Sequence, residues 1–384
     1  MYITERILSL LIFSLVLVLI CCGIANSKLK VGKKLITLYI LILGIMGYCF
    51  IPHMGADLTR LLITMKFYTS KGTEGLYSAL LSSSTPGTGL YFYIIGKTGN
   101  DHLLPAISAV ITYSFCFSIL KREYNNYETR SLYIAVMIFA FMSRGLTMQI
   151  ISNIRTLMAL SICAWCVYKE FCKKEKTAKF IIFYLIAASI HIMGQVILLY
   201  RIVYFVIDKG KNYSQKVVRT GMAVIFGVLI WVLGNKYISE MLLKTDYYFS
   251  YAQSGTSYNY IWERVLSIMS LILVIYLLVE FKKCKKKLER EGKFHEEATV
   301  SLTRYLVPLI IMDILIMPIE FNFFQRLSWF LTIMTMPLGM SVLRMGRHVG
   351  INKIIINNIL IYSVFMLALA CVRGDLCSLK FFLF

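Results

Sequence analysis

The chain has 384 residues, of which 58% are hydrophobic and 16% charged, and its mean hydropathy is +0.70. A water-soluble fold could not bury this much apolar surface, so the composition excludes a soluble enzyme. The net charge of +21 does not indicate nucleic-acid binding, because the positive residues lie mostly in short segments between apolar runs. The composition therefore predicts an integral membrane protein.

Apolar runs near the roughly 20 residues that cross a bilayer recur along the whole chain. They predict an all-α polytopic protein in which residues 1–384 form a single transmembrane domain. The first run lacks a clear small-residue cleavage site, so we expect a span there and not a signal peptide. We assign twelve spans, at about 7–25, 35–52, 102–120, 131–147, 151–168, 180–194, 196–207, 220–235, 261–280, 302–318, 325–342 and 354–372.

The basic residues predict the orientation of these spans. Of the 41 lysines and arginines, 27 lie in six short segments, at 28–34, 121–130, 169–179, 209–219, 282–304 and 344–353. Lysine and arginine accumulate in the cytoplasmic loops of membrane proteins. The six segments alternate correctly as cytoplasmic loops, and the remaining connections are therefore expected to face outside.

Two of the expected outer connections are long. Residues 53–101 contain the run Gly89-Leu90-Tyr91-Phe92-Tyr93-Ile94-Ile95, which is too short to span and predicts an interfacial or re-entrant helix. A second outer loop, rich in tyrosine, runs to about residue 260. The sixth and seventh spans share only about 28 residues, so each is expected to be short or tilted.

Arg155 opens the fifth span from the outer side, in Ser152-Asn153-Ile154-Arg155-Thr156. An arginine at the mouth of a membrane helix is costly unless it is paired or reaches water. We expect Arg155 to face an outward cavity and hold a phosphate-linked substrate. The alternative is an anchor whose side chain reaches the lipid headgroups.

Other polar residues are expected at the same outer depth. They are Asp57 and Arg60 after the second span, His191 near the end of the sixth, Arg201 in the seventh, Asp313 inside the tenth, and Glu320 and Arg326 around the following turn. Simpler roles are open to each, such as a surface ion pair, a hydrogen-bonded core histidine or an interface anchor. Their convergence favours a wet cavity, and the planar arginine fork suits phosphate. The sequence has no Walker loop, HExxH, GxSxG or metal-ligand spacing, so we expect neither a metal nor a cofactor.

The order of these residues carries a resemblance to a known family. Asp57-x-x-Arg60 follows the second span, and Asn153-Ile154-Arg155-x-x-x-Ala159 opens a middle span. His191 comes about 36 residues later, and Phe324-Gln325-Arg326 precedes an apolar run that ends at Pro337. Over roughly residues 35–345 this pattern resembles the EpsG-type branch of Wzy-like polysaccharide polymerases.

The resemblance implies a membrane glycosyltransferase that acts on the outer face of the cytoplasmic membrane. It would join oligosaccharide repeats carried on undecaprenyl diphosphate into a capsule, exopolysaccharide or O-antigen type of surface polysaccharide. Membrane lipids, a flippase and a chain-length regulator are the expected partners, and nucleic acid is not.

Because diphosphate is already a good leaving group, such a reaction needs charge neutralisation and alignment more than covalent catalysis. Our hypothesis is that Arg155 and Arg326 clamp the diphosphate, with Arg60 or Arg201 as a further donor. His191 is the first choice for the base, and Asp57 is the second or else holds Arg60 in place.

Two other classes remain open. A transporter or flippase for lipid-linked sugar or another anion would also use intramembrane arginine and aspartate. The missing internal repeat and the concentration of charge on one face count against it. A multispan acyltransferase would be expected to carry a histidine with an acidic or arginine partner near the start of the chain, and the first two spans have none before His53.

Overall fold

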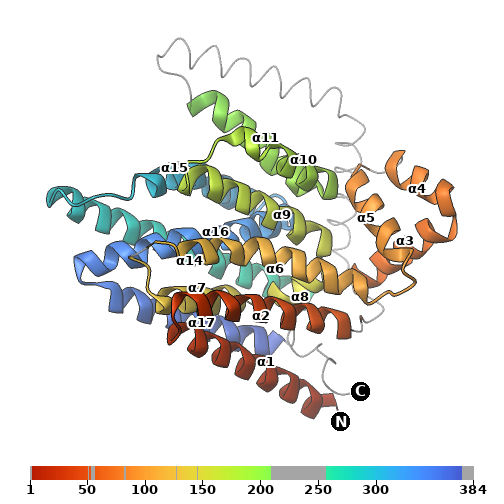
Figure 1. Ribbon diagram of the computed structural model, residues 1–384, viewed down its shortest axis with the longest axis horizontal. Coiled ribbons are helices and arrows are strands. Elements are labelled where there is room, and N and C mark those ends of the chain that lie inside the picture. Colours follow the sequence, from red (N-terminus) through yellow and green to blue (C-terminus); the bar gives the residue numbers. More distant parts are fainter. Residues whose placement is uncertain are drawn as a thin grey trace.

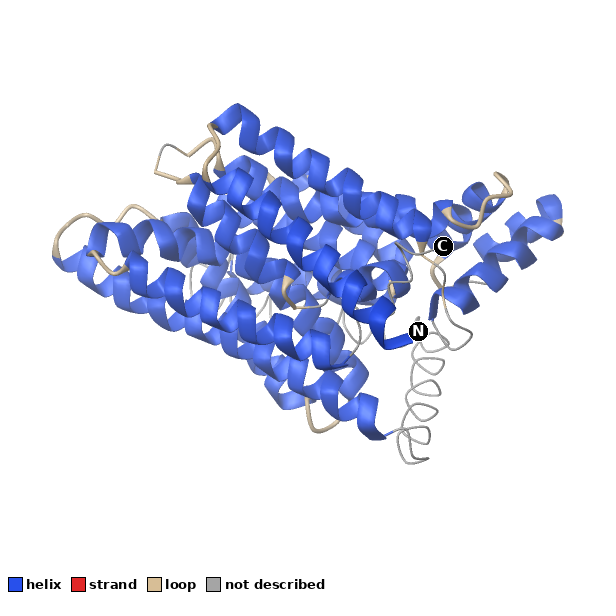
Figure 2. Ribbon diagram, turned by 90° about the horizontal axis from the view of Figure 1, so that it is seen from below, coloured by secondary structure: helices blue, strands red, loops and turns tan. Residues whose placement is uncertain are grey.

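The computed structural model describes residues 2–50, 52, 57–81, 84–126, 128–144, 146–208 and 257–373. Within these ranges the chain forms helices joined by short connections and contains no strand, as Figure 2 shows. The predicted all-α class is therefore confirmed. The expected eighth span at 220–235 and most of the second outer loop lie outside the described residues.

The N-terminal half contains most of the short helices. In chain order the helices are α1 (Tyr2–Ala25), α2 (Leu29–Cys49), α3 (Asp57–Ser70), α4 (Gly72–Leu81), α5 (Pro86–Gly96), α6 (Leu103–Glu123), α7 (Ser131–Met142), α8 (Leu146–Ser152) and α9 (Ile154–Val167). A π turn (Tyr168–Cys172) and a 3-10 turn (Thr177–Lys179) follow. The remaining described helices are α10 (Ile181–Ile190), α11 (Ile192–Asp208), α14 (Ser257–Arg290), α15 (Glu297–Ile316), α16 (Phe321–Val349) and α17 (Asn352–Arg373).

Five helices in the described ranges are long and apolar enough to cross a membrane, namely α6, α14, α15, α16 and α17. Shorter apolar helices cover Leu11–Ala25, Ser131–Met142, Ile181–Ile190 and Ile192–Val206. The structure thus supports several of the twelve expected spans but divides others. The fifth expected span is split at Asn153 between α8 and α9, and the boundary between the sixth and seventh falls at His191.

Close helix packing depends on glycine in α2, which lies against α6 (Figure 1). A Cβ atom at Gly47 would lie 2.8 Å from the carbonyl oxygen of Pro105, and one at Gly44 would lie 2.4 Å from the side chain of Val110. Small residues let helix backbones approach closely where the surrounding solvent gives no hydrophobic drive for association. A larger residue at Gly47 would force the two helices apart, whereas one at Gly44 would displace the side chain of Val110.

The connections that carry the basic segments within the described residues meet at one end of the bundle, whereas the basic segment at 209–219 lies outside those residues. Ser131 Oγ donates a hydrogen bond to the carbonyl of Ser27, at 2.9 Å. Lys174 Nζ lies 3.4 Å from a carboxylate oxygen of Glu297. We call this the basic end; it includes the connections at 25–29, 123–131, 168–181, 290–297 and 349–352. The starts of α9 and α16 and the α10–α11 turn are consequently at the opposite end.

Residues 53–101 were expected to be a loop with one short helix. The expected helix is present as α5, but α3 and α4 precede it, and the three lie together at the opposite end in Figure 1. Pro86 occupies the first turn of α5, where its missing N–H has no consequence. Thr88 Oγ1 donates to the carbonyl of Ile190 at 2.5 Å, and Gln195 Nε2 donates to that of Ser84 at 3.1 Å. These bonds dock the start of α5 onto the α10–α11 turn.

Candidate functional site

Arg155 is the second residue of α9 and is half-buried at the opposite end. The helix restarts here because Asn153 leaves helical geometry between α8 and α9, where its side-chain amide donates to Gln149 Oε1. The first turn of a helix exposes backbone N–H groups and the positive end of its dipole. An arginine in that turn adds a full positive charge, so the start of α9 favours an anion.

The next residue, Thr156, is buried and links α9 to the α10–α11 turn. Its Oγ1 lies 3.1 Å from His191 Nε2, while the backbone N–H of Met193 donates to His191 Nδ1 at 3.1 Å. Because Nδ1 accepts a hydrogen bond, the neutral ring carries its proton on Nε2 and donates it to Thr156. In this arrangement His191 has no unused lone pair, so it can act as a base only after the Met193 bond is released.

Replacing Thr156 with valine is expected to lower the free energy of unfolding by about 1–3 kcal/mol, because the buried Nε2–H of His191 would lose its acceptor. The measurement is the fraction of purified protein that stays monodisperse in detergent after heating. Thr335→Val is the matched control, since Thr335 is equally buried and its hydroxyl donates to the carbonyl of Thr332 in its own helix. Equal losses in the two variants would contradict a specific role for the Thr156–His191 contact.

Asp57 and Arg60 form the predicted pair in the first turn of α3, with 2.7 Å between Arg60 Nη2 and Asp57 Oδ1. The arginine side chain is 66% exposed and the aspartate 23% exposed. Exposed pairs of this kind contribute little to stability. The pair lies on α3, which contacts α8, the helix that leads directly into α9.

The α15–α16 turn carries the other candidates at this end. Arg326 is half-buried in the second turn of α16. Glu320 caps that helix by accepting from the backbone N–H groups of Asn322 and Phe323, which satisfies its carboxylate locally. Arg155, His191 and Arg326 therefore lie at the same end of the bundle. Glu320 lies there too, but its carboxylate caps α16.

Asp313 is fully buried in α15, where its Oδ2 accepts from Ser328 Oγ at 2.8 Å. Arg144, at the end of α7, lies within electrostatic reach of this carboxylate and is itself only 5% exposed. Sequence reasoning missed Arg144, although it stands at the expected outer end of an apolar run in the same way as Arg155. The structure gives Asp313 a nearby positive partner and adds a third buried or half-buried arginine at this end.

Arg201 is not brought together with Arg155. Its Nε and Nη2 atoms donate to Glu170 Oε2 at 2.9 and 2.5 Å, and Nη2 also donates to Thr177 Oγ1 at 3.1 Å. Glu170 lies in the π turn that follows α9, toward the basic end. The expected contribution of Arg201 to an outer diphosphate site is therefore not supported by its position.

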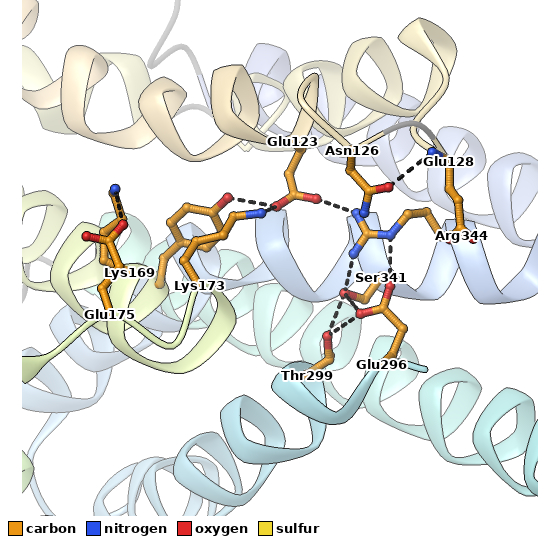
Figure 3. Close-up of polar contacts among 11 residues, drawn as sticks. Glu123, Asn126, Glu128, Lys169, Lys173, Glu175, Glu296, Thr299, Ser341 and Arg344 are labelled. Carbon is orange, nitrogen blue, oxygen red and sulfur yellow. Dashed lines mark hydrogen bonds and ion pairs between the residues drawn. The ribbon is translucent and has the colours of Figure 1, made fainter. Parts of the chain in front are cut away.

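Sequence reasoning also missed a buried ion network at the basic end, which Figure 3 shows around Arg344 of α16. Arg344 Nη1 donates to Glu123 at the end of α6, and Arg344 Nε donates to Glu296 at 2.9 Å. Tyr168 Oη and Lys173 Nζ donate to the other oxygen of Glu123, at 2.7 and 2.8 Å. The network joins the end of α6, the π turn after α9, the N-cap of α15 and α16, so it holds the basic end together.

A second pair lies beside this network (Figure 3). Lys169 Nζ is 2.6 Å from Glu175 Oε1, and this hydrogen bond lowers the pKa of the Glu175 carboxyl below its usual value.

In the described ranges, no group of three histidine, cysteine, aspartate or glutamate side chains is placed to hold a metal ion.

Apolar helices of spanning length and buried charge between them define a helical membrane protein. The chain belongs to the EpsG family, a family of Wzy-like polysaccharide polymerases, and the family model matches residues 66–382. The resemblance predicted from the sequence is confirmed. The match begins after Asp57 and Arg60 and includes Arg155, His191 and Arg326. Neither the curated proteins nor the solved structures contain a significant match to this chain.

Proposed function

We propose that the chain is a membrane glycosyltransferase that polymerises lipid-diphosphate-linked oligosaccharide repeats on the outer face of the cytoplasmic membrane. The observation that carries the proposal is the position of Arg155, at the start of α9 beside the Thr156–His191 contact, in a chain of the EpsG family. The basic end faces the cytoplasm in this proposal, which follows the distribution of lysine and arginine. The product would be a surface polysaccharide.

In the reaction, the bond between the anomeric carbon of the donor chain and its lipid diphosphate breaks. The oxygen of an acceptor hydroxyl forms the new glycosidic bond, and its proton passes to a base. Arg155 and Arg326 neutralise the charge that develops on the diphosphate, with Arg60 as a further donor from α3. Fixed positive groups aimed at developing charge are an effective source of rate acceleration in such sites.

His191 can accept the proton at Nδ1 if a bound substrate displaces the Met193 N–H bond, while the Nε2–H stays on the ring and continues to donate to Thr156 Oγ1. Asp57 is the second choice, and its bond to Arg60 equally suits a positioning role. Asp313, in the last turn of α15, and Arg144, within electrostatic reach of its carboxylate, are proposed to maintain the charge balance of this end.

The proposal is tested with the purified chain in liposomes, supplied with lipid-linked repeat units extracted from producing cells in which its gene is deleted. We expect a ladder of products longer than one repeat, resolved by gel electrophoresis, without any other protein. Transfer of single repeats across the liposome membrane without chain growth would overturn the proposal and indicate a flippase.

We expect polymer formation to be unchanged by EDTA, because arginines take the place of a divalent cation at the diphosphate in this proposal. The measurement is the initial rate of chain growth before and after dialysis against the chelator. A loss of activity that magnesium restores would show that the diphosphate is held through a metal ion.

A further inference from the structure

The helices α3, α4 and α5 form a small group at the opposite end of the bundle, which we call the cap (Figure 1). They approach one another closely at glycine. A Cβ atom at Gly89 would lie 2.6 Å from the carbonyl oxygen of Ala79, and one at Gly96 would lie 2.5 Å from the side chain of Thr69. This packing buries only one face of each helix, and the proposed function uses only the first turn of α3.

The exposed faces of the cap carry apolar side chains in groups. The members are Ile63 and Phe67 in α3, Tyr77, Leu80 and Leu81 in α4, and Leu90 and Ile94 in α5. Single exposed apolar residues are ordinary on any protein, but residues three or four positions apart share one side of a helix. Each helix of the cap therefore has an apolar patch, and Leu81 is 84% exposed. Such patches indicate contact with a partner or with a membrane.

The exposed polar residues of the cap are gathered along one edge. The turn between α3 and α4 exposes residues 70, 71, 73 and 74, and the residues just after α5, at 97–99, are exposed as well. We call residues 70–74 and 97–99 the polar edge. The contact of Gly96 with Thr69 brings its two parts together. Within α4 alone, Thr73 and Glu74 at the start are polar, whereas the end is apolar. A polar edge beside apolar patches is the pattern of helices at a boundary between water and lipid.

Basic residues stand next to the apolar patches. Arg60 precedes Ile63 by one turn, and Lys71 follows Phe67 by one turn, with its Nζ 4.4 Å from the centroid of the ring. Lys97 follows the apolar patch of α5 in the same way. At a membrane boundary, long basic side chains lay their stems along apolar groups and extend their charge to lipid phosphates. The charges of the cap thus complement a layer of phospholipid headgroups.

The cap is fastened to the bundle where α6 begins and α10 ends. Lys66 Nζ is 2.5 Å from a carboxylate oxygen of Asp101, just before α6, and Thr88 donates to the last residue of α10. The helix α10 also exposes Ile182 and Leu185, which face lipid chains in a membrane. The lipid-facing surface of the bundle therefore includes the helix to which the cap is attached, and lipid is within reach of the cap.

We propose that the cap lies in the headgroup layer of the adjoining leaflet, which is the outer leaflet in the proposed orientation. Its apolar patches point into the acyl chains, its lysines reach the phosphates, and its polar edge faces water. The partner of this surface is the phospholipid bilayer, and a bound protein is the competing outcome of the test. The proposal does not depend on the polymerase activity, because the apolar patches have no part in the reaction.

The test uses the full chain in phosphatidylcholine nanodiscs that contain a phosphatidylcholine with a diazirine on one acyl chain. A parallel sample is treated with a water-soluble diazirine, and mass spectrometry of peptides locates the labelled residues after irradiation. We expect lipid labelling around Leu81 to exceed that around Thr73 about tenfold, with the reverse order for the water-soluble reagent. Ile182 of α10 is the reference for contact with lipid. Lipid labelling at Ile182 but not at Leu81 would overturn the proposal and leave the cap surface to water or to a protein partner.

Replacing Tyr77 and Leu81 together with glutamine is expected to reduce lipid labelling of Ile63 and Phe67 in α3 roughly threefold, because the cap loses apolar groups that hold it in the leaflet. Both replaced side chains are exposed, so the packing within the cap is retained. Thr73→Gln is the matched control at the polar edge, and it should leave the labelling unchanged. Unchanged labelling of α3 in the double variant, or an equal loss in Thr73→Gln, would contradict the assignment.

Discussion

Replacing Arg155 with alanine is expected to reduce polymer formation about a hundredfold or more while leaving the amount of protein in the membrane unchanged. Removing one group that stabilises developing negative charge typically costs that much in rate. Arg155 is half-buried in the first turn of α9, so the helix can form without it. The measurement is the rate of chain growth per molecule of purified protein in liposomes.

Arg264→Ala is the control for this prediction. Arg264 is an exposed arginine of α14 at the same end, stacked on Phe321 with 5.4 Å between the guanidinium carbon and the ring centroid. Its replacement removes the same charge from the same region and should leave most of the activity. Arg155→Lys should retain part of the rate, because an ammonium keeps the charge but not the two-pronged geometry. Full activity of Arg155→Ala would remove Arg155 from the proposed diphosphate site.

Replacing Arg344 with alanine is expected to lower the free energy of unfolding by about 3–5 kcal/mol, since breaking a buried ion pair leaves an uncompensated charge. The side chains of Arg344 and Glu123 are only 6% and 4% exposed. Without the guanidinium, Glu123 keeps the bonds from Tyr168 and Lys173, but Glu296 loses its ionic partner. The thermal midpoint of the purified protein in detergent measures the loss.

Arg347→Ala is the matched control for the basic end. Arg347 lies one turn further along α16 and is exposed, so its loss should change the free energy of unfolding by less than about 0.5 kcal/mol. Arg344→Lys should fall between the two, because the ammonium keeps the charge but lacks the planar fork that places Nε and Nη1 against two separate carboxylates. Similar midpoints for Arg344→Ala and Arg347→Ala would show that the network contributes nothing.

The helix break at His191 illustrates where local pattern ceases to predict structure. Residues 180–207 are almost continuously apolar, and the sequence placed the boundary between two spans near residue 195. In the structure, α10 ends at Ile190, and a Cβ atom at Gly194 would lie 2.3 Å from the carbonyl oxygen of Ala187. The turn is decided by this close contact and by the hydrogen bonds that join it to Thr88 and Ser84, about 100 positions earlier in the chain.

The two arginines Arg155 and Arg201 look alike in the sequence, since each stands in an apolar run. The end of the bundle at which each arginine lies depends on the direction of its helix and on the residue to which its side chain bonds. Arg201 is bonded to Glu170, a residue that sequence reasoning had counted only as part of a basic loop. Arg344 was likewise assigned to a basic loop, although its partner Glu123 lies 221 positions earlier.

The sequence by itself determined that this protein is helical, resides in a membrane, gathers its basic residues in short connections and belongs to the EpsG family. These properties follow from run length, charge and motif order, which are local or additive features of the chain. Only the tertiary structure decided that Thr156 holds His191, that Arg201 is neutralised by Glu170, and that Arg344 binds two glutamates. Hydrogen bonds and ion pairs act over a few ångströms, so they depend on which distant helices become neighbours.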